Sequence, residues 1–474
     1  MLVTSPQFKQ KAHDAMGNEG LQRALQRARP GFPAKRAAAM ARLPEFEALR
    51  EAARDIKNHT LENLDFYLEA FEANVIRAGG KVHWCADAAA ARETVLAICR
   101  EAGARTVTKG KSMLSEECGI NDHLEAHGIT PVETDLAEYI LQLRREPPSH
   151  IIAPAFHLNR EDWEESFRRA HTDLDPERVF AERRDILTEA RAQLRGKFLV
   201  ADVGITGANF LVAETGSSVI VTNEGNGDLT QTLPRVHITL ASIEKTVPTL
   251  EDCATLLRLL ARSATGQDMS VYTTFSTGAR RSADPDGPAA YHVVLVDNGR
   301  SGMLGTQFQE MLRCIRCAAC MNHCPVYSTV GGHSYGWVYP GPMGSVLTPG
   351  LVGVEKAGML PNASTFCGKC ESVCPVKIPL PMLMRHWRER EFERHLTPAA
   401  TRRYLRLWAA IARRPGLYRV VTRLAAAGMR LVSRDGRVRF LPGGRGWTQG
   451  RDFPAPQGET FFARYAREQR AARR

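Results

Sequence analysis

The pattern of apolar and polar positions divides the chain into a helical beginning, an alternating middle and a cysteine-rich, basic end. Up to about residue 80, apolar residues recur at helical spacing, which predicts amphipathic helices. From residue 81 onward, short apolar runs alternate with helical segments. We predict strands at 81–86, 105–110 and 149–156, and helices at 88–103 and 116–128. This rhythm is typical of βαβ units and predicts a parallel sheet.

The chain then becomes richer in predicted strands. After a polar segment at 175–198 that predicts a helix, we expect strands within 209–228, where glycine joins two apolar runs, and at 235–241, 270–276 and 290–298. Residues 304–310 predict the start of a helix, whereas the Pro/Gly-rich segment 339–350 predicts irregular structure. Amphipathic helices are expected at 401–416 and 417–433, followed by an extended arm at 444–465.

Composition places the chain among ordinary globular proteins. Its 474 residues are 43% hydrophobic and 24% charged, which excludes fibrous and low-complexity classes. The first twenty residues are polar and lack the apolar core of a signal peptide, and no apolar run is long enough for a membrane span. We therefore expect a cytoplasmic protein.

The positive charge is concentrated at one end. The net charge is +11, yet residues 377–474 alone hold 23 Lys and Arg against 7 Asp and Glu, so the rest of the chain is mildly acidic. A basic arm of this kind favours an acidic protein partner or an anionic lipid surface, with a peripheral link to the membrane and its quinone pool, over nucleic acid.

Cysteines carry the clearest chemical signal. Of eleven, Cys85, Cys99, Cys118 and Cys253 are scattered singly, and seven lie within 314–374. The run from Cys314 to Pro325 has the C-x2-C-x2-C-x3-C-P spacing of bacterial ferredoxins. Such clustering without an export signal indicates metal or redox chemistry, and zinc is the weaker alternative because it favours two separate C-x2-C pairs.

The second run repeats the last three cysteines of the first, and Ser364 stands where a first cysteine is expected. Crossed ligation, in which the last cysteine of each run binds the other cluster, predicts two ligand sets. The first is Cys314, Cys317, Cys320 and Cys374, and the second is Cys324, Cys367 and Cys370. We expect two [4Fe-4S] clusters, although three thiolates leave the second either as [3Fe-4S] or with a labile iron ligand such as Ser364.

Three basic residues lie next to predicted ligand cysteines. Arg316 and Lys369 adjoin ligand cysteines and would raise the cluster potential, although solvated surface charge is the simpler interpretation. His323 lies next to Cys324 and is expected to be structural.

The middle of the chain resembles a known domain. Residues 202–217, 221–227 and 233–238 carry motifs similar to the core signature of the LUD domain. Together with the cysteine runs and segment 331–349, residues 60–460 resemble the lactate utilization protein B family, whose members have the same seven cysteines. The resemblance implies an α/β fold similar to the NagB/RpiA/CoA-transferase sandwich. It also implies an iron-sulfur subunit of a three-protein bacterial system that oxidises L-lactate to pyruvate, with a second iron-sulfur subunit and a second LUD-domain subunit as partners.

These inferences predict four regions. They are a helical segment at 1–60, a LUD domain at 61–300, an α-helical ferredoxin-type two-cluster module at 301–395, and basic C-terminal helices with an arm at 396–474.

The LUD body offers polar groups but no recognisable catalytic motif. Candidate groups are Glu214, Glu224, Asp202, His237 and Glu244, each with an equally good structural role, and the loop 108–112 predicts an anion site. No dinucleotide fingerprint is present. We expect an electron-transfer subunit. The alternatives are a LUD body that transforms an organic acid with a labile cluster iron as Lewis acid, and a structural or regulatory cluster protein.

Overall fold

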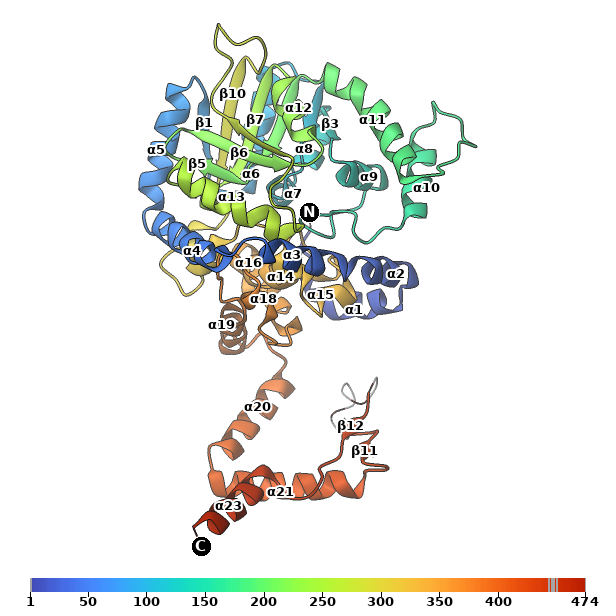
Figure 1. Cartoon of the computed structure of the whole chain (residues 1–474), viewed down its shortest axis with the longest axis vertical. Coiled ribbons are helices and arrows are strands. Elements are labelled where there is room, and N and C mark those ends of the chain that lie inside the picture. Colours follow the sequence, from blue (N-terminus) through green and yellow to red (C-terminus); the bar gives the residue numbers. More distant parts are fainter. Residues whose placement is uncertain (1, 442–443, 445–447, 449–450, 474) are drawn as a thin grey trace. The chain divides into compact units, whose positions relative to one another are not determined.

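The computed structural model describes residues 2–441, 444, 448 and 451–473 (Figure 1). The chain divides into two compact units, residues 1–391 and residues 392–474. The first unit holds the six-stranded and four-stranded sheets and both cysteine runs.

A six-stranded parallel sheet forms the centre of the first unit. Its strand order is β1-β10-β7-β4-β2-β3. The bounds are β1 (Lys81–Cys85), β2 (Thr106–Lys109), β3 (Thr130–Glu133), β4 (Val203–Gly207), β7 (Val236–Ser242) and β10 (Ala290–Val296). Strand β10 is mostly apolar, with an unbroken run at Val293–Val296, which suits a strand covered on both faces by helices and a second sheet. This confirms the predicted α/β fold with a parallel sheet.

Alternate residues of the sheet enter two different cores. Val294 and Val296 pack with Val95 and Leu96 of α6 (Ala88–Glu101) on one face. This face is also covered by α7 (Met113–Cys118) and α8 (Ile120–Ala126). The opposite face packs on α5 (Leu64–Arg77) and on strand β5. The chain therefore forms layers on both sides of the sheet (Figure 1).

A smaller sheet links these layers to the cysteine-bearing helices. Its order is β8-β5-β6-β9, with β5 (Phe210–Val212), β6 (Ser217–Thr222), β8 (Thr246–Val247) and β9 (Tyr272–Ser276). Phe210 and Val212 point away from the large sheet into a core shared with α4 (Phe46–Glu62), α13 (Leu250–Ala264) and the cysteine runs.

The other helices of the first unit lie at its N-terminus, around the edge strand β3 and around the cysteines. Those before the cysteines are α1 (Phe8–Gly17), α2 (Glu19–Ala28), α3 (Gly31–Ala41), α9 (Leu136–Arg144), α10 (Arg160–Ala170), α11 (Arg183–Val200) and α12 (Asn226–Thr232). Those of the cysteine region are α14 (Ala319–Asn322), α15 (Tyr327–Val330), α16 (Gly341–Val352), α17 (Val354–Ala357), α18 (Lys369–Ser372) and α19 (Leu380–Glu393).

The second unit contains both amphipathic helices expected there. They are α20 (Ala399–Ala412) and α21 (Pro415–Leu431), and a short antiparallel pair, β11 (Arg437–Val438) and β12 (Phe453–Pro454), follows. The expected extended arm is wrong from residue 461, where α23 (Phe461–Ala472) begins; residues 445–447 and 449–450 of that arm lie outside the described residues. Among the helices described, none is long and apolar enough to cross a membrane.

The predicted strand at 149–156 is wrong. This segment is a loop, closed where Ser149 N–H and Oγ–H donate to the Pro154 carbonyl. The edge of the large sheet is formed instead by β3, which contains Pro131 and for which the sequence predicted no strand. An edge strand tolerates proline because one row of its backbone amides has no partner strand.

Three helix predictions need correction. Segment 116–128 is not one helix, because Gly119 at φ 68° separates α7 from α8. The helix expected from residue 175 begins at Arg183, where Glu182 and Asp185 form a capping box. Residues 304–310 do not start an α-helix, since only 3-10 turns at Ser301–Met303 and Gln309–Arg313 occur there.

Candidate metal centre

The two cysteine runs have the same backbone geometry. A 3-10 turn, Gln309–Arg313 or Leu360–Ala363, ends in an extended residue, which is Cys314 in the first run and Ser364 in the second. The residues on either side of the second cysteine slot are left-handed in both runs: φ is 60° at Arg316 and Ala318, and 55° and 76° at Phe366 and Gly368. A one-turn helix, α14 or α18, follows. Ser364 is therefore the structural counterpart of Cys314.

Seven cysteines line two cavities. One cavity is lined by Cys314, Cys317, Cys320 and Cys374. The other is lined by Cys324, Cys367 and Cys370, and by Ser364. These are the two sets that crossed ligation requires, with each run sending its last cysteine to the other cavity. The ligation itself stays a prediction.

The cysteine pattern fits clusters better than single ions. Zinc requires its sulfur ligands about 2.3 Å from one atom, whereas a four-iron cube places each thiolate on a different iron. Four cysteines in the first run and three in the second follow the cluster pattern, so the sequence spacing favours iron-sulfur clusters over zinc.

Backbone hydrogen bonds and burial both affect the ionisation of the cysteine sulfurs. Backbone N–H groups of Tyr327 and Ile378 donate to the sulfurs of Cys324 and Cys374 at 3.5 and 3.4 Å. Burial raises the pKa of Cys317 to about 12, and the neighbouring thiol of Cys374 adds to this effect. The thiolate form is thus costly without a cation, so metal binding and ionisation of these cysteines are coupled.

Helix α16 corrects the prediction of an irregular connector at 339–350. Pro342 lies in the first turn, where its missing N–H costs no hydrogen bond, and residues 341–349 are buried. Pro342 and Ser345 line the cavity of Cys324, whereas Met343 lines that of Cys314. The Pro/Gly-rich helix is therefore a wall between the two cysteine sets and packs beside α14 (Figure 1).

Two arginines near the N-terminus hold the second cysteine run. The buried Arg36 donates to the Val373 carbonyl at 3.0 Å, and Arg50 donates to the Cys374 carbonyl at 2.7 Å and to Ser372 at 3.0 Å. They lie more than 300 residues from these partners in sequence, and no local pattern in the sequence singles them out. They place positive charge beside the cavity of Cys374.

Arg316 is not a solvated surface charge, contrary to the simpler expectation. Its side chain is 10% exposed and its Nη2 donates to Glu244 at 2.9 Å. Glu244 also pairs with Arg300 at 3.0 Å, and Arg300 pairs with Glu117 at 2.7 Å, all fully buried. Burial would raise the pKa of Glu244, but Arg300 and Arg316 outweigh it and lower that pKa to about 2. This network joins the first cysteine loop to the ends of β7 and β10.

The other residues singled out near the cysteines have simpler surroundings. Lys369 is exposed, as the surface interpretation expects. His323 Nδ1 lies 2.8 Å from the Ala319 carbonyl, a local contact typical of a structural histidine. Cys99, Cys118 and Cys253 are buried outside both cavities, and burial raises the pKa of each to about 12.

Three family matches cover most of the chain. Residues 68–296 match the LUD domain, residues 310–378 match the 4Fe-4S dicluster domain, and residues 388–470 match the C-terminal domain of lactate utilisation protein B. The lactate utilization protein B of Bacillus licheniformis is 42% identical over 464 residues, covering 97% of this chain and 96% of its own. The chain belongs to the lactate utilization protein B family.

Other members are equally similar. Lactate utilization protein B of Oceanobacillus iheyensis is 43% identical and that of Bacillus subtilis 41%, over 96% and 97% of this chain and 95% and 96% of their own. A solved DUF162 family structure from Deinococcus radiodurans covers 49% of this chain and 98% of its own at 15% identity, and its TM-score of 0.26 is too low to support an argument. The dicluster match confirms an iron-sulfur module.

Most polar candidates of the LUD domain have structural roles. Asp202 accepts from the backbone of Arg105 at 2.8 Å, Glu214 accepts from Leu250 N–H at the start of α13, and His237 contacts Thr206 Oγ1 at 2.8 Å. Glu224 instead lines a large cavity together with Lys111 and Ser112 of the predicted anion loop. Lys109 of the same loop is buried and paired with Glu133 at 2.6 Å, so it takes no part in that cavity.

Ser364 provides a test of the second cysteine set in this family member. We expect Ser364→Cys to supply a fourth thiolate at the backbone position that Cys314 occupies in the first run, and so to retain the fourth iron during oxidation. The measurement is low-temperature EPR after controlled oxidation, where the three-iron signal should fall to background in the variant. Ser372→Cys, an exposed neighbour outside both cavities, is the control. An equal three-iron signal in wild type and Ser364→Cys contradicts the prediction.

Proposed function

We propose that this chain is the iron-sulfur electron-transfer subunit of a complex that oxidises L-lactate to pyruvate. The observation that carries the proposal is the pair of cysteine-lined cavities on either side of α16. A pair of clusters supplies one-electron redox chemistry, and close cavities allow an electron to pass between them. The names of the relatives support lactate as the substrate of the system.

The exposure of the two cysteine sets indicates which of them exchanges electrons with a partner at the surface. Cys317, Cys320 and Cys374 are buried, and their loop adjoins the LUD domain through Arg316. Cys367 is exposed, as are Thr365 and Lys369 beside it. The second set therefore offers the surface at which a redox partner exchanges electrons, while the first set lies on the side of the LUD sheet. We propose [4Fe-4S] clusters at both, with Ser364 beside the fourth iron of the second.

Lactate oxidation needs more than this chain. Conversion of L-lactate to pyruvate releases two electrons and two protons. This sequence carries no dinucleotide fingerprint for a cofactor that would take the two electrons and one proton as a hydride, with the second proton released. We propose that a second iron-sulfur subunit and a second LUD-domain subunit complete the reaction. The exposed apolar residues of α20, Tyr404, Leu407 and Trp408, stand among arginines and suit the second unit for docking such a partner.

Anaerobic mixing with L-lactate tests the proposal. We expect the visible absorbance of the oxidised clusters to bleach when the companion proteins are present and to stay unchanged with this chain alone, because a relay needs a two-electron site elsewhere. The Cys320→Ser variant, assembled with the same companions, is the control and should accept fewer electrons. Reduction of the isolated chain by lactate would support the enzymatic alternative, and no bleaching with all components present would overturn the relay.

A further inference from the structure

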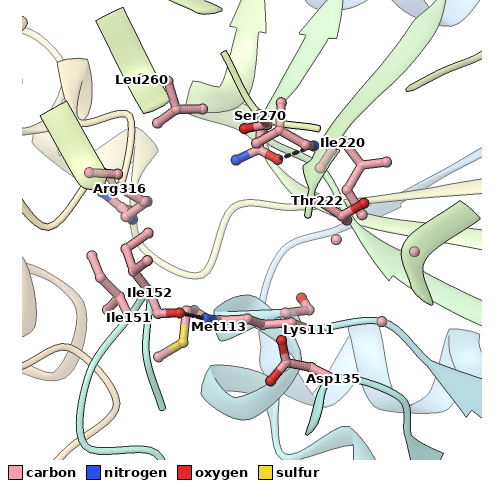
Figure 2. Close-up of a pocket in the computed structure, with 18 of the residues that line it drawn as sticks. Lys111, Met113, Asp135, Ile151, Ile152, Ile220, Thr222, Leu260, Ser270 and Arg316 are labelled. Atoms are coloured by element: carbon pink, nitrogen blue, oxygen red, sulfur yellow. Dashed lines mark hydrogen bonds between the residues drawn. The ribbon is translucent and has the colours of Figure 1, made fainter. Parts of the chain in front are cut away.

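A cavity of about 240 Å³ lies at the carboxyl ends of the central strands, next to the first cysteine loop. Gly110 and Lys111 follow β2, Gly207 ends β4, and Ser242 and Lys245 follow from β7. Figure 2 shows Arg316, Ile151 and Ile152 on one side of the cavity and Ile220, Thr222 and Ser270 on the other. The carboxyl edge of a parallel sheet is where α/β proteins usually bind ligands.

Two cations that line this cavity have hydrogen-bond donors without an acceptor among the described residues. Arg316 Nη1 is buried and makes no hydrogen bond, although Nη2 of the same guanidinium binds Glu244. Within the described residues, the Lys245 ammonium also makes no hydrogen bond, and burial lowers its pKa to about 7. Both side chains line this cavity and not that of Cys314, although Arg316 also lies near enough to Cys314 to interact with a thiolate there.

The ion pairs around the cavity leave out Lys245. Arg300 and Arg316 pair with Glu117 and Glu244, whereas Lys245 forms no ion pair within the described residues. A partly buried ammonium without a counter-charge is costly, so an anion that enters the cavity would stabilise the Lys245 ammonium. Asp135 and Glu224 also line the cavity. Asp135 caps α9 by accepting from Ala137 and Glu138 N–H, and burial raises the pKa of Glu224, which favours its uncharged form.

The rest of the lining points to an organic anion. Ile151, Ile152 and Leu260 provide an apolar wall, which inorganic phosphate would leave without a contact. Asn209 lines the same space, and its Oδ1 accepts from Val221 N–H at 3.0 Å, so its side chain adds a polar group to the lining. Lys111 is less available because its ammonium binds the Ile152 carbonyl.

We propose that this cavity binds a small organic carboxylate, whose oxygens are held by Arg316 and Lys245 and whose carbon skeleton lies against Ile151, Ile152 and Leu260. Since Arg316 lies between Cys314 and Cys317, the bound carboxylate adds a negative charge beside the first cysteine loop. Added negative charge disfavours the reduced form of a cluster held there, so binding lowers its potential.

Calorimetry on the full-length protein with its clusters tests this site. The probes are sodium pyruvate, sodium L-lactate and sodium phosphate at constant ionic strength, and only the choice of the first two rests on the proposed function. We expect a carboxylate to bind with one site per chain, and Lys245→Gln to weaken binding at least about tenfold because a charge-assisted hydrogen bond is lost. Lys245→Arg should retain most of the affinity. The control is Lys9→Gln, an exposed lysine outside the cavity, with unchanged affinity.

A second readout is the midpoint potential of the first cluster, followed by EPR in a redox titration. Saturating carboxylate should lower it in wild type and leave it unchanged in Lys245→Gln, whose visible spectrum confirms that the clusters are intact. Absence of carboxylate binding, binding of phosphate alone, or affinity equal in Lys245→Gln and wild type would overturn the inference. Electron transfer with the companion proteins is measured separately, so a relay without carboxylate binding refutes this site but not the proposed function.

Discussion

Cys314→Ser and Cys374→Ser should lose the same cluster. Although 60 residues separate them, both side chains line one cavity, so each substitution removes a thiolate from the same four-cysteine set. We expect each variant to keep about half of the iron and acid-labile sulfide, since the other set keeps its thiolates. Low-temperature EPR of the reduced proteins should show the same remaining signal in both.

Cys324→Ser and Cys367→Ser should show the complementary result. Their side chains line the other cavity, so the signal that remains should be the one missing from the first pair. Cys253→Ser, a buried cysteine outside both sets, is the control and should keep all of the iron. If ligation instead followed each run along the chain, Cys314→Ser and Cys324→Ser would leave the same signal. That result would refute crossed ligation.

The second large effect is expected at Glu244. Glu244→Gln keeps the shape of the side chain but leaves Arg300 and Arg316 without the carboxylate that both contact. Removing one partner of a buried ion pair costs about 3–5 kcal/mol, because the remaining charges stay desolvated. We therefore expect the free energy of unfolding to fall by an amount in this range.

Anaerobic denaturant unfolding of the cluster-loaded protein measures the change. Glu125→Gln, an exposed glutamate on α8, should stay within about 0.5 kcal/mol of wild type. Because Arg316 lies in the first cysteine loop, Glu244→Gln should also release the first cluster at lower denaturant than wild type, as followed by visible absorbance. An unfolding free energy equal to that of Glu125→Gln would refute a stabilising role for the network.

The sequence predicted most of the large sheet because its strands are short apolar runs between helices. β10 is buried on both faces, and a strand of this kind is typically apolar at consecutive positions, as at Val293–Val296. β3 was missed because its four residues include proline and lie at an edge, where pairing on one side is enough. The central strand β4 was also missed, because Gly204, Thr206 and Gly207 interrupt its apolar residues. Segment 149–156 was mistaken for a strand because its apolar residues enter a core from a closed loop.

Helix α16 shows where composition misleads. Pro and Gly favour irregular structure, yet Pro342 fits in the first turn of this helix. Gly344 lies so close to the Tyr339 carbonyl that a Cβ at position 344 would be 1.7 Å from its oxygen, so only glycine allows this approach. Those contacts exist only once the cysteine region has folded around the helix.

The sequence by itself determined the cysteine spacing, the missing thiol at Ser364, the α/β alternation and the family resemblance, since each depends on residues close together in the chain or on a pattern they form. Only the tertiary structure decided that Arg36 and Arg50 hold the second run, that Arg316 is buried against Glu244, and that this arginine faces a cavity of the LUD domain. Those properties depend on burial and on contacts between distant segments, because the same charged residue is a solvated side chain or a buried ion-pair partner according to what the fold places beside it.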